Sequence, residues 1–255
     1  MKIAVTGKGG VGKTTLAASL ARLYAADGKS VLAVDADPDA NLGLALGFTE
    51  EEISRITPIA EMEDLIAERT GADKNSYGSF FKINPKVDDI PDRFAVDKDG
   101  VKLLVMGTVE TGGGGCVCPE NVMLKRVISH LVIGSEDVVV MDMEAGIEHL
   151  GRGTAGMVDR FIVVVEPGAR SIQTYGRIKS LAADLGVTQV SVVGNKITNE
   201  SDKAFISERA PEADILGYIS YSEDVMKADK AGVSPLTAGA IFTKEVKAIK
   251  ERIGS

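Results

Sequence analysis

A glycine-rich segment between a predicted strand and a predicted helix constrains the fold of this chain more than any other feature. The strand is Lys2–Thr6 and the helix runs from Leu16 to Ala26. Between them, residues 7–15 read GKGGVGKTT and match the phosphate-loop pattern G-x-x-x-x-G-K-[ST]. Glycines allow successive backbone N–H groups to surround an anion, and the helix N-terminus adds its positive dipole end. The segment therefore predicts a site for a nucleoside triphosphate.

Individual roles follow from the same pattern. Lys13 is expected to pair with the outer phosphates, and the Thr14 hydroxyl is the expected protein ligand of Mg²⁺. The backbone around the phosphates should come from neighbouring loop positions. The predicted nucleotide-binding residues of the loop are Gly9, Gly10, Val11, Gly12, Lys13, Thr14 and Thr15.

Strand-like and helical patterns alternate along the rest of the chain. Further strands are predicted at Val31–Asp35, Val101–Met106, Val138–Asp142, Phe161–Val165, Gln189–Asn195 and Ile215–Ile219, with helices such as Pro119–Leu131, Arg170–Leu185 and Asp202–Arg209 between them. This alternation predicts an α/β fold with a doubly wound, mostly parallel sheet and helices on both faces. Ligands of such sheets bind at the carboxyl ends of the strands, where the phosphate loop also lies.

The length of 255 residues fits a single phosphate-loop domain spanning 1–255. Its least regular part is a predicted insertion at about 48–100, with a helix near Ile59–Arg69 and a loop around Asn84–Arg93. This insertion either covers the surface or docks a partner, and we favour the first.

Composition narrows the function classes. The net charge of −8 argues against a general nucleic-acid partner, which needs a basic face. No apolar run approaches the roughly 20 residues that span a bilayer, so no membrane partner is predicted. Two cysteines without a secretory signal indicate a cytoplasmic protein without a disulfide framework.

A second lysine in the loop, Lys8, follows the first glycine. In this the chain resembles the deviant Walker-A ATPases, the family of MinD, the ParA partition ATPases and the nitrogenase iron protein. The resemblance implies that Lys8 reaches the partner's ATP across a nucleotide-sandwich homodimer, as an arginine finger does in trans. The alternative is an ordinary exposed loop lysine.

The resemblance covers nearly the whole chain and implies further roles. Asp37, in the sequence DADPDAN (35–41), would orient or deprotonate the attacking water, although Asp39 remains a second candidate. Asp142 ends an apolar strand in the Walker-B arrangement and should hold Mg²⁺ through a water molecule. Catalysis of ATP hydrolysis to ADP and phosphate would then depend on Lys8, Lys13 and Asp37.

The adenine base is expected to bind at the end of the predicted strand Gln189–Asn195. In the family an Asn at the place of Asn195 hydrogen-bonds adenine, and Lys196 follows it. The aspartate of the GTP-binding motif Asn/Thr-Lys-x-Asp is missing, because Thr198 stands in its place. Relatives usually carry Pro where this chain has Ser220, so that part of the adenine pocket departs from the family pattern.

Both cysteines of the chain lie two positions apart, as Cys116 and Cys118, after a run of four glycines. Thiolates select soft metals such as Zn²⁺, thiolate-bound Ni²⁺, Cu(I) or Fe–S clusters. A Cys-x-Cys pair supplies two ligands, and a closed tetrahedral site needs four, which two protomers facing each other would provide. The alternatives are ordinary loop thiols or a reversible redox pair.

Two histidines complete the set of candidate ligands. His130 lies on an apolar helical pattern and is interpreted as structural. His149 lies in the segment 142–154, which corresponds to switch II of the family, and is either an interface or relay residue or a structural one.

The Cys-x-Cys pair and the switch II sequence together resemble the nickel-insertion accessory ATPases of carbon monoxide dehydrogenase, the CooC type. This resemblance implies an ATP-dependent homodimer that binds Ni²⁺ or Zn²⁺ at Cys116 and Cys118 and delivers nickel to the active-site cluster of carbon monoxide dehydrogenase. The metal, the state of the apo protein and the client stay open, because a related branch serves acetyl-CoA synthase.

Two rival hypotheses belong to other classes. An iron–sulfur reductase like the nitrogenase iron protein would need a cysteine in switch II, and residues 142–154 contain none. A MinD/ParA-type positioning ATPase could use the amphipathic pattern Ile241–Ile253 as a membrane helix. We favour a core role for that helix, and this rival leaves the cysteine pair unexplained.

Overall fold

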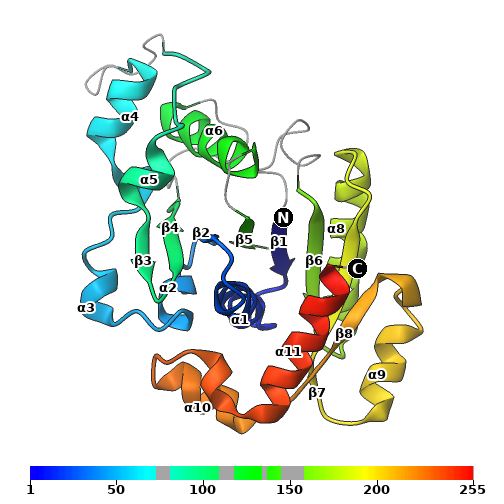
Figure 1. The fold of residues 1–255 in the computed structure, drawn as a ribbon. Helices are drawn as coiled ribbons and strands as arrows, with labels where there is room; N and C mark the ends of the chain where they lie inside the picture. The colour runs from blue at the N-terminus through cyan, green and yellow to red at the C-terminus, as the bar shows by residue number, and fades with distance from the viewer. Residues whose placement is uncertain (73–80, 109–117, 134–136, 145–157, 255) are drawn as a thin grey trace.

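The computed structural model describes residues 1–72, 81–108, 118–133, 137–144 and 158–254 (Figure 1). They form one eight-stranded sheet in the order β3-β4-β2-β5-β1-β6-β7-β8. All neighbouring strands are parallel except β3, which is antiparallel to β4. The strands are β1 (Lys2–Gly7), β2 (Val31–Ala36), β3 (Val96–Lys98), β4 (Val101–Val105), β5 (Val138–Met143), β6 (Arg160–Val165), β7 (Val190–Ile197) and β8 (Ile215–Ser220). This confirms the predicted fold class.

The central strands are apolar on both faces, so the sheet separates two hydrophobic cores. Along β1, Ile3 and Val5 belong to one core and Ala4 to the other. All six residues of β1 and of β5 are buried, which explains why these strands read as continuous apolar runs.

Helices cover each face. One core lies beneath α1 (Lys13–Ala26), α2 (Leu42–Ala45), α3 (Glu50–Ile53), α10 (Glu223–Lys230) and α11 (Ala240–Ile253). The other lies beneath α4 (Glu63–Thr70), α5 (Ile90–Phe94), α6 (Pro119–Ile133), α8 (Ala169–Asp184) and α9 (Glu200–Ser207). Figure 1 shows α1 and α11 on one side of the sheet and α6 on the other. Short 3₁₀ segments are η1 (Ile59–Glu61), η2 (Glu212–Asp214) and η3 (Pro235–Ala238).

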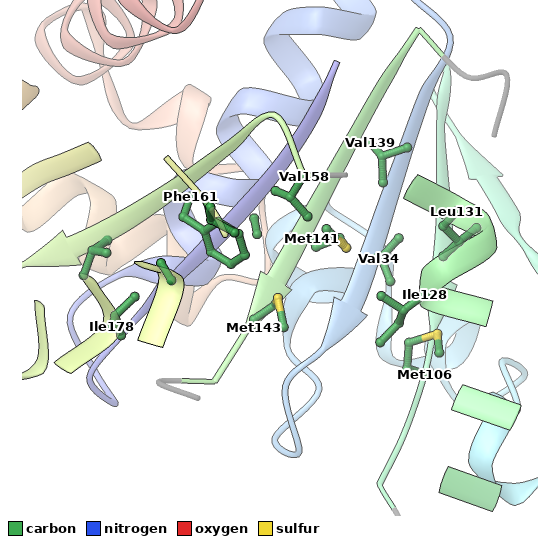
Figure 2. Packing of buried hydrophobic residues seen from close by; sticks show 14 of the residues in the cluster. Val34, Met106, Ile128, Leu131, Val139, Met141, Met143, Val158, Phe161 and Ile178 are labelled. Carbon is green, nitrogen blue, oxygen red and sulfur yellow. The ribbon is translucent and has the colours of Figure 1, made fainter. Parts of the chain in front are cut away.

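Helix α6 runs antiparallel to the neighbouring strands β4 and β5. In Figure 2, Ile128 lies toward Met106 at the carboxyl end of the sheet, whereas Leu131 lies toward Val139 near the start of β5. Helix α6 therefore begins at the carboxyl edge, the same edge at which β1 enters the glycine-rich loop.

The predicted strands after the first agree with the observed ones within two residues, but three local predictions were wrong or incomplete. The predicted Ile59–Arg69 helix is divided into η1 and α4, because Met62, with φ −82° and ψ 67°, interrupts the helical path. The predicted loop 84–93 contains the start of α5, and the short edge strand β3 within 48–100 was missed.

The C-terminal helix α11 lies on the sheet with its apolar side inward. Phe242, Val246, Ile249 and Ile253 are buried in the core that α1 shares, while Ile241 at its start is 71% exposed. Within the described residues, no helix combines the length and the apolar character needed to cross a bilayer.

Candidate nucleotide and metal site

A cavity of about 830 Å³ opens at the carboxyl edge of the sheet. Its walls come from the glycine-rich loop, the segment after β2, the end of β7 and the α10–α11 region. The wall includes Lys8, Gly9, Gly10, Gly12, Lys13, Thr14, Thr15, Asp37, Asp39, Glu144, Asn195, Lys196, Ile219, Tyr221, Met226 and Phe242. The structure thus brings together residues that the sequence placed in four separate segments.

The loop itself depends on glycine at two positions. Gly10 and Gly12 have φ of 77° and 95°, in the left-handed region that other residues avoid. A Cβ on Gly12 would also lie 2.3 Å from the Asn195 Nδ2 atom. Gly12 precedes the first residue of α1, so the loop leads directly into a helix N-terminus that favours anions.

Lys13 and Asp37 form an ion pair within the cavity. The Lys13 Nζ lies 3.3 Å from Asp37 Oδ2, and the two side chains are only 8% and 15% exposed. Asp39 donates its backbone N–H to Asp37 Oδ1 at 3.1 Å. Of the two candidate aspartates, it is therefore Asp37 whose carboxylate contacts the phosphate-loop lysine.

Thr14 and Asp142, the two predicted magnesium residues, contact each other. The Thr14 hydroxyl donates to Asp142 Oδ2 at 2.6 Å, and Asp142 is completely buried. Burial raises the pKa of the Asp142 carboxyl to about 6, against the opposing effects of the Thr14 hydrogen bond and the Lys13 charge. Among the described residues, the other oxygen, Asp142 Oδ1, has no hydrogen-bond partner. A buried oxygen without a partner beside a hydroxyl suits a hard cation such as Mg²⁺.

Asp35 belongs to this site and was given no role in the sequence analysis. It lies directly opposite Asp142 in the β2–β5 register and is 1% exposed. Burial first, and then repulsion from Asp142, raises the pKa of its carboxyl to about 7. Its Oδ2 accepts the Leu42 N–H at 2.8 Å, which anchors the segment carrying Asp37. The sequence signal was available, since Val31–Asp35 is an apolar strand ending in a carboxylate, like Val138–Asp142.

Asn195 and Lys196 lie against the glycine-rich loop. The Asn195 side-chain amide donates to the Val11 carbonyl at 2.8 Å, and the Lys196 ammonium donates to the Gly10 carbonyl at 2.7 Å. Both residues line the cavity, and the contact of Asn195 with adenine stays a prediction.

Two further predicted positions have defined surroundings. Lys8 is half-buried at the wall of the cavity. Ser220 ends β8, and both its N–H and its hydroxyl donate to the Glu245 carboxylate of α11, at 2.9 and 2.6 Å. Glu245 thereby satisfies the backbone N–H that a proline at this position would lack.

The cysteine pair is described only in part. Cys118 is partly exposed and lies immediately before α6, where its carbonyl accepts the Val122 N–H at 3.0 Å. Cys116 and His149 lie outside the described residues, and His130 is on α6. Within the described ranges, no three His, Cys, Asp or Glu residues are grouped in a way that could hold a metal ion.

Comparison with known proteins agrees with this geometry. The family described as the CobQ/CobB/MinD/ParA nucleotide binding domain (CbiA) matches residues 2–236. The carbon monoxide dehydrogenase accessory protein CooC of Rhodospirillum rubrum is 49% identical over 92% of this chain and 89% of its own length. An uncharacterized ATP-binding protein of Methanocaldococcus jannaschii is 46% identical over 98% of this chain and 96% of its own.

Solved structures show the same fold at lower identity. MinD in the MinC:MinD cell division complex of Aquifex aeolicus has a TM-score of 0.67 at 22% identity, covering 100% of this chain and 96% of that one. A ParA family ATPase from Chlorobium tepidum has a TM-score of 0.69 at 18% identity, with 96% of each chain covered. The chain therefore belongs to the CobQ/CobB/MinD/ParA nucleotide-binding family, and within it to the ATPases of the CooC type.

Proposed function

We propose that this ATPase is a nickel metallochaperone that matures carbon monoxide dehydrogenase. ATP binding would join two copies, creating a metal site from the Cys116 and Cys118 pairs of both, and hydrolysis would release the metal to the client. The observation that carries the proposal is the 49% identity to a carbon monoxide dehydrogenase accessory protein, in a chain whose cysteine pair adjoins a helix beginning at the nucleotide edge of the sheet.

Lys13, the predicted partner of the phosphates, forms an ion pair with Asp37. The phosphates of ATP are stronger partners for Lys13 than a single carboxylate, so nucleotide binding would free Asp37. The released carboxylate would lie within the same cavity, where it can accept a proton from the attacking water. Lys8, on the wall of that cavity, would reach the phosphates bound by the partner.

Magnesium would be held by the Thr14 hydroxyl and by Asp142, whose Oδ1 has no hydrogen-bond partner among the described residues. When bound there, Mg²⁺ would neutralise phosphate charge. The protein's own contribution is the burial of Asp142, which keeps bulk water away from that oxygen.

Metal binding and ATP binding would be coupled because both depend on the dimer. If ATP and a thiolate-bound metal both favour the closed dimer, each must tighten binding of the other by the same factor. Opening after hydrolysis would leave two half-sites of two thiolates each, too few for a closed tetrahedral site. Such half-sites would hold nickel weakly enough to transfer it.

The test combines mass by light scattering with metal content, measured with Ni²⁺ or Zn²⁺ and with or without ATP. We expect the wild type to form a dimer carrying about one metal ion per two chains. The Cys116→Ala/Cys118→Ala variant should lose the metal, and Lys8→Ala should bind ATP while losing ATP-dependent dimerisation. Lys29→Ala, an exposed lysine on the opposite edge of the sheet, is the matched control. Metal binding by the wild type that does not respond to ATP would contradict the proposed coupling.

The client is tested separately by reconstitution. Nickel-loaded wild-type protein with ATP should activate nickel-free carbon monoxide dehydrogenase, and the double cysteine variant should not. Activation of nickel-free acetyl-CoA synthase instead would keep the metallochaperone function and change the client.

A further inference from the structure

Lys196 has an unusual backbone for a residue with a long side chain. Its φ is 57°, and Asp99 in a tight turn is the only other non-glycine with positive φ in the described part of the chain. The β7–β8 pairing is irregular here, with a register shift between Gly194 and Ile197. Such backbone strain persists only where surrounding contacts maintain it.

The Lys196 side chain contacts both the glycine-rich loop and the residue after β6. Its ammonium donates to the Gly10 carbonyl at 2.7 Å and lies 3.4 Å from the Glu166 carboxylate, which follows β6 directly. Its backbone N–H donates to Asn195 Oδ1 at 2.8 Å, which fixes the Asn195 amide on the Val11 carbonyl. The side chains of Asn195 and Lys196 therefore hold two successive carbonyls of the loop, those of Val11 and Gly10.

Fixing these carbonyls has a consequence for the N–H groups. In a planar trans peptide, the C=O and the following N–H point in opposite directions. Holding the Val11 carbonyl toward β7 therefore directs the Gly12 N–H the other way, and the Val11 N–H, which follows the Gly10 carbonyl, donates to the Lys8 carbonyl at 3.4 Å within the loop. Backbone N–H groups such as that of Gly12 are the donors that a phosphate-binding loop offers to its anion.

We propose that Lys196 is a positioning residue that orients the phosphate loop through the Gly10 carbonyl, with Glu166 fixing its ammonium, and that it does not itself read the base. The proposal goes beyond the predicted nucleotide contact at Lys196. This role requires only that the protein binds and hydrolyses ATP, and it does not rest on the proposed metal function.

The experiment measures ATP hydrolysis and its inhibition by two competitors, ADP and pyrophosphate. The variants are Lys196→Met and Lys196→Gly, which both remove the ammonium, and Lys196→Arg, which keeps a cation. Glycine also relieves the backbone strain, so it separates strain from charge. Lys203→Met, on the outer surface of α9, is the matched control. Urea unfolding curves establish that every variant is folded.

We expect Lys196→Met and Lys196→Gly to raise the KM for ATP about tenfold, with kcat changed much less. The inhibition constants of ADP and pyrophosphate should rise by the same factor, because the loop contacts only phosphate. Lys196→Arg should recover most of the loss, and Lys203→Met should match the wild type. Weaker ADP binding with unchanged pyrophosphate binding would instead assign Lys196 to the base. A Lys196→Gly enzyme with wild-type KM would also overturn the proposal.

Discussion

Two buried carboxylates facing each other across neighbouring strands should make the stability of the empty protein depend on pH. Asp35 and Asp142 are register partners on β2 and β5, and neither is more than 1% exposed. The pKa of Asp35 is raised from 3.8 to about 7, by burial first and by repulsion from Asp142 second. The pKa of Asp142 is raised to about 6, chiefly by burial.

The direction of the effect follows from the raised values. Between pH 4 and 7, the folded protein holds protons on these carboxyls that the unfolded chain has lost. The free energy of unfolding therefore falls as the pH rises through this window, and it levels off above about pH 7. One pKa unit corresponds to about 1.4 kcal/mol, so the shift of Asp35 alone corresponds to about 4 kcal/mol.

The variant Asp35→Asn removes the contribution of Asp35 to this dependence while keeping a carbonyl oxygen for the Leu42 N–H. In urea unfolding with EDTA, we expect the variant to exceed the wild type by about 2–4 kcal/mol at pH 8 and to match it near pH 4. Asp184→Asn, at an exposed position of α8, should follow the wild type at every pH. Equal pH slopes for wild type and Asp35→Asn, or a less stable variant at pH 8, would refute the argument.

Other substitutions test the loop and its surroundings. Gly12→Ala would place a Cβ 2.3 Å from Asn195 Nδ2 at φ 95°, and should weaken ADP binding at least tenfold by calorimetry. Its control is Gly176→Ala on α8, where a Cβ added at Gly176 would have no contact within 4 Å among the described residues. This substitution should raise the free energy of unfolding by about 0.5–1 kcal/mol, because alanine favours the helix over glycine. Glu245→Ala leaves the Ser220 N–H and hydroxyl without their acceptor and should cost about 1–2 kcal/mol in urea unfolding, whereas Ser220→Ala should cost less because its N–H stays bonded.

The sequence predicted the parts of this molecule that depend on local chemistry. The glycine-rich loop lies within a single strand–turn–helix unit, and its lysine and threonine are adjacent to its glycines. Asp142 was found because an apolar strand ending in a carboxylate is a local pattern. Even the missed strand β3 had such a signal, since Asp99 and Gly100, with φ of 50° and 81°, form the Asp-Gly turn typical of hairpins.

What could not be predicted depends on strand order and register. Asp35 ends an apolar strand as Asp142 does, but its position opposite Asp142 follows only from β2 lying beside β5. Lys196 contacts the glycine-rich loop from 186 residues away in the chain. Neither neighbour can be read from spacing, because several strand orders satisfy the same alternation of strands and helices.

The charges around Lys13 imply that nucleotide and Mg²⁺ should bind together. Asp37 and Asp142 both lie near the buried Lys13, and Asp35 lies beside Asp142, so phosphates arriving alone would meet carboxylates as well as a cation. Mg²⁺ arriving alone would meet the Lys13 charge. Each partner removes the repulsion that the other meets, so the affinity for ADP should rise when Mg²⁺ is present, and by linkage the affinity for Mg²⁺ should rise equally with ADP. At pH 8, above both raised pKa values, equal ADP affinity in EDTA and in Mg²⁺ would refute this coupling.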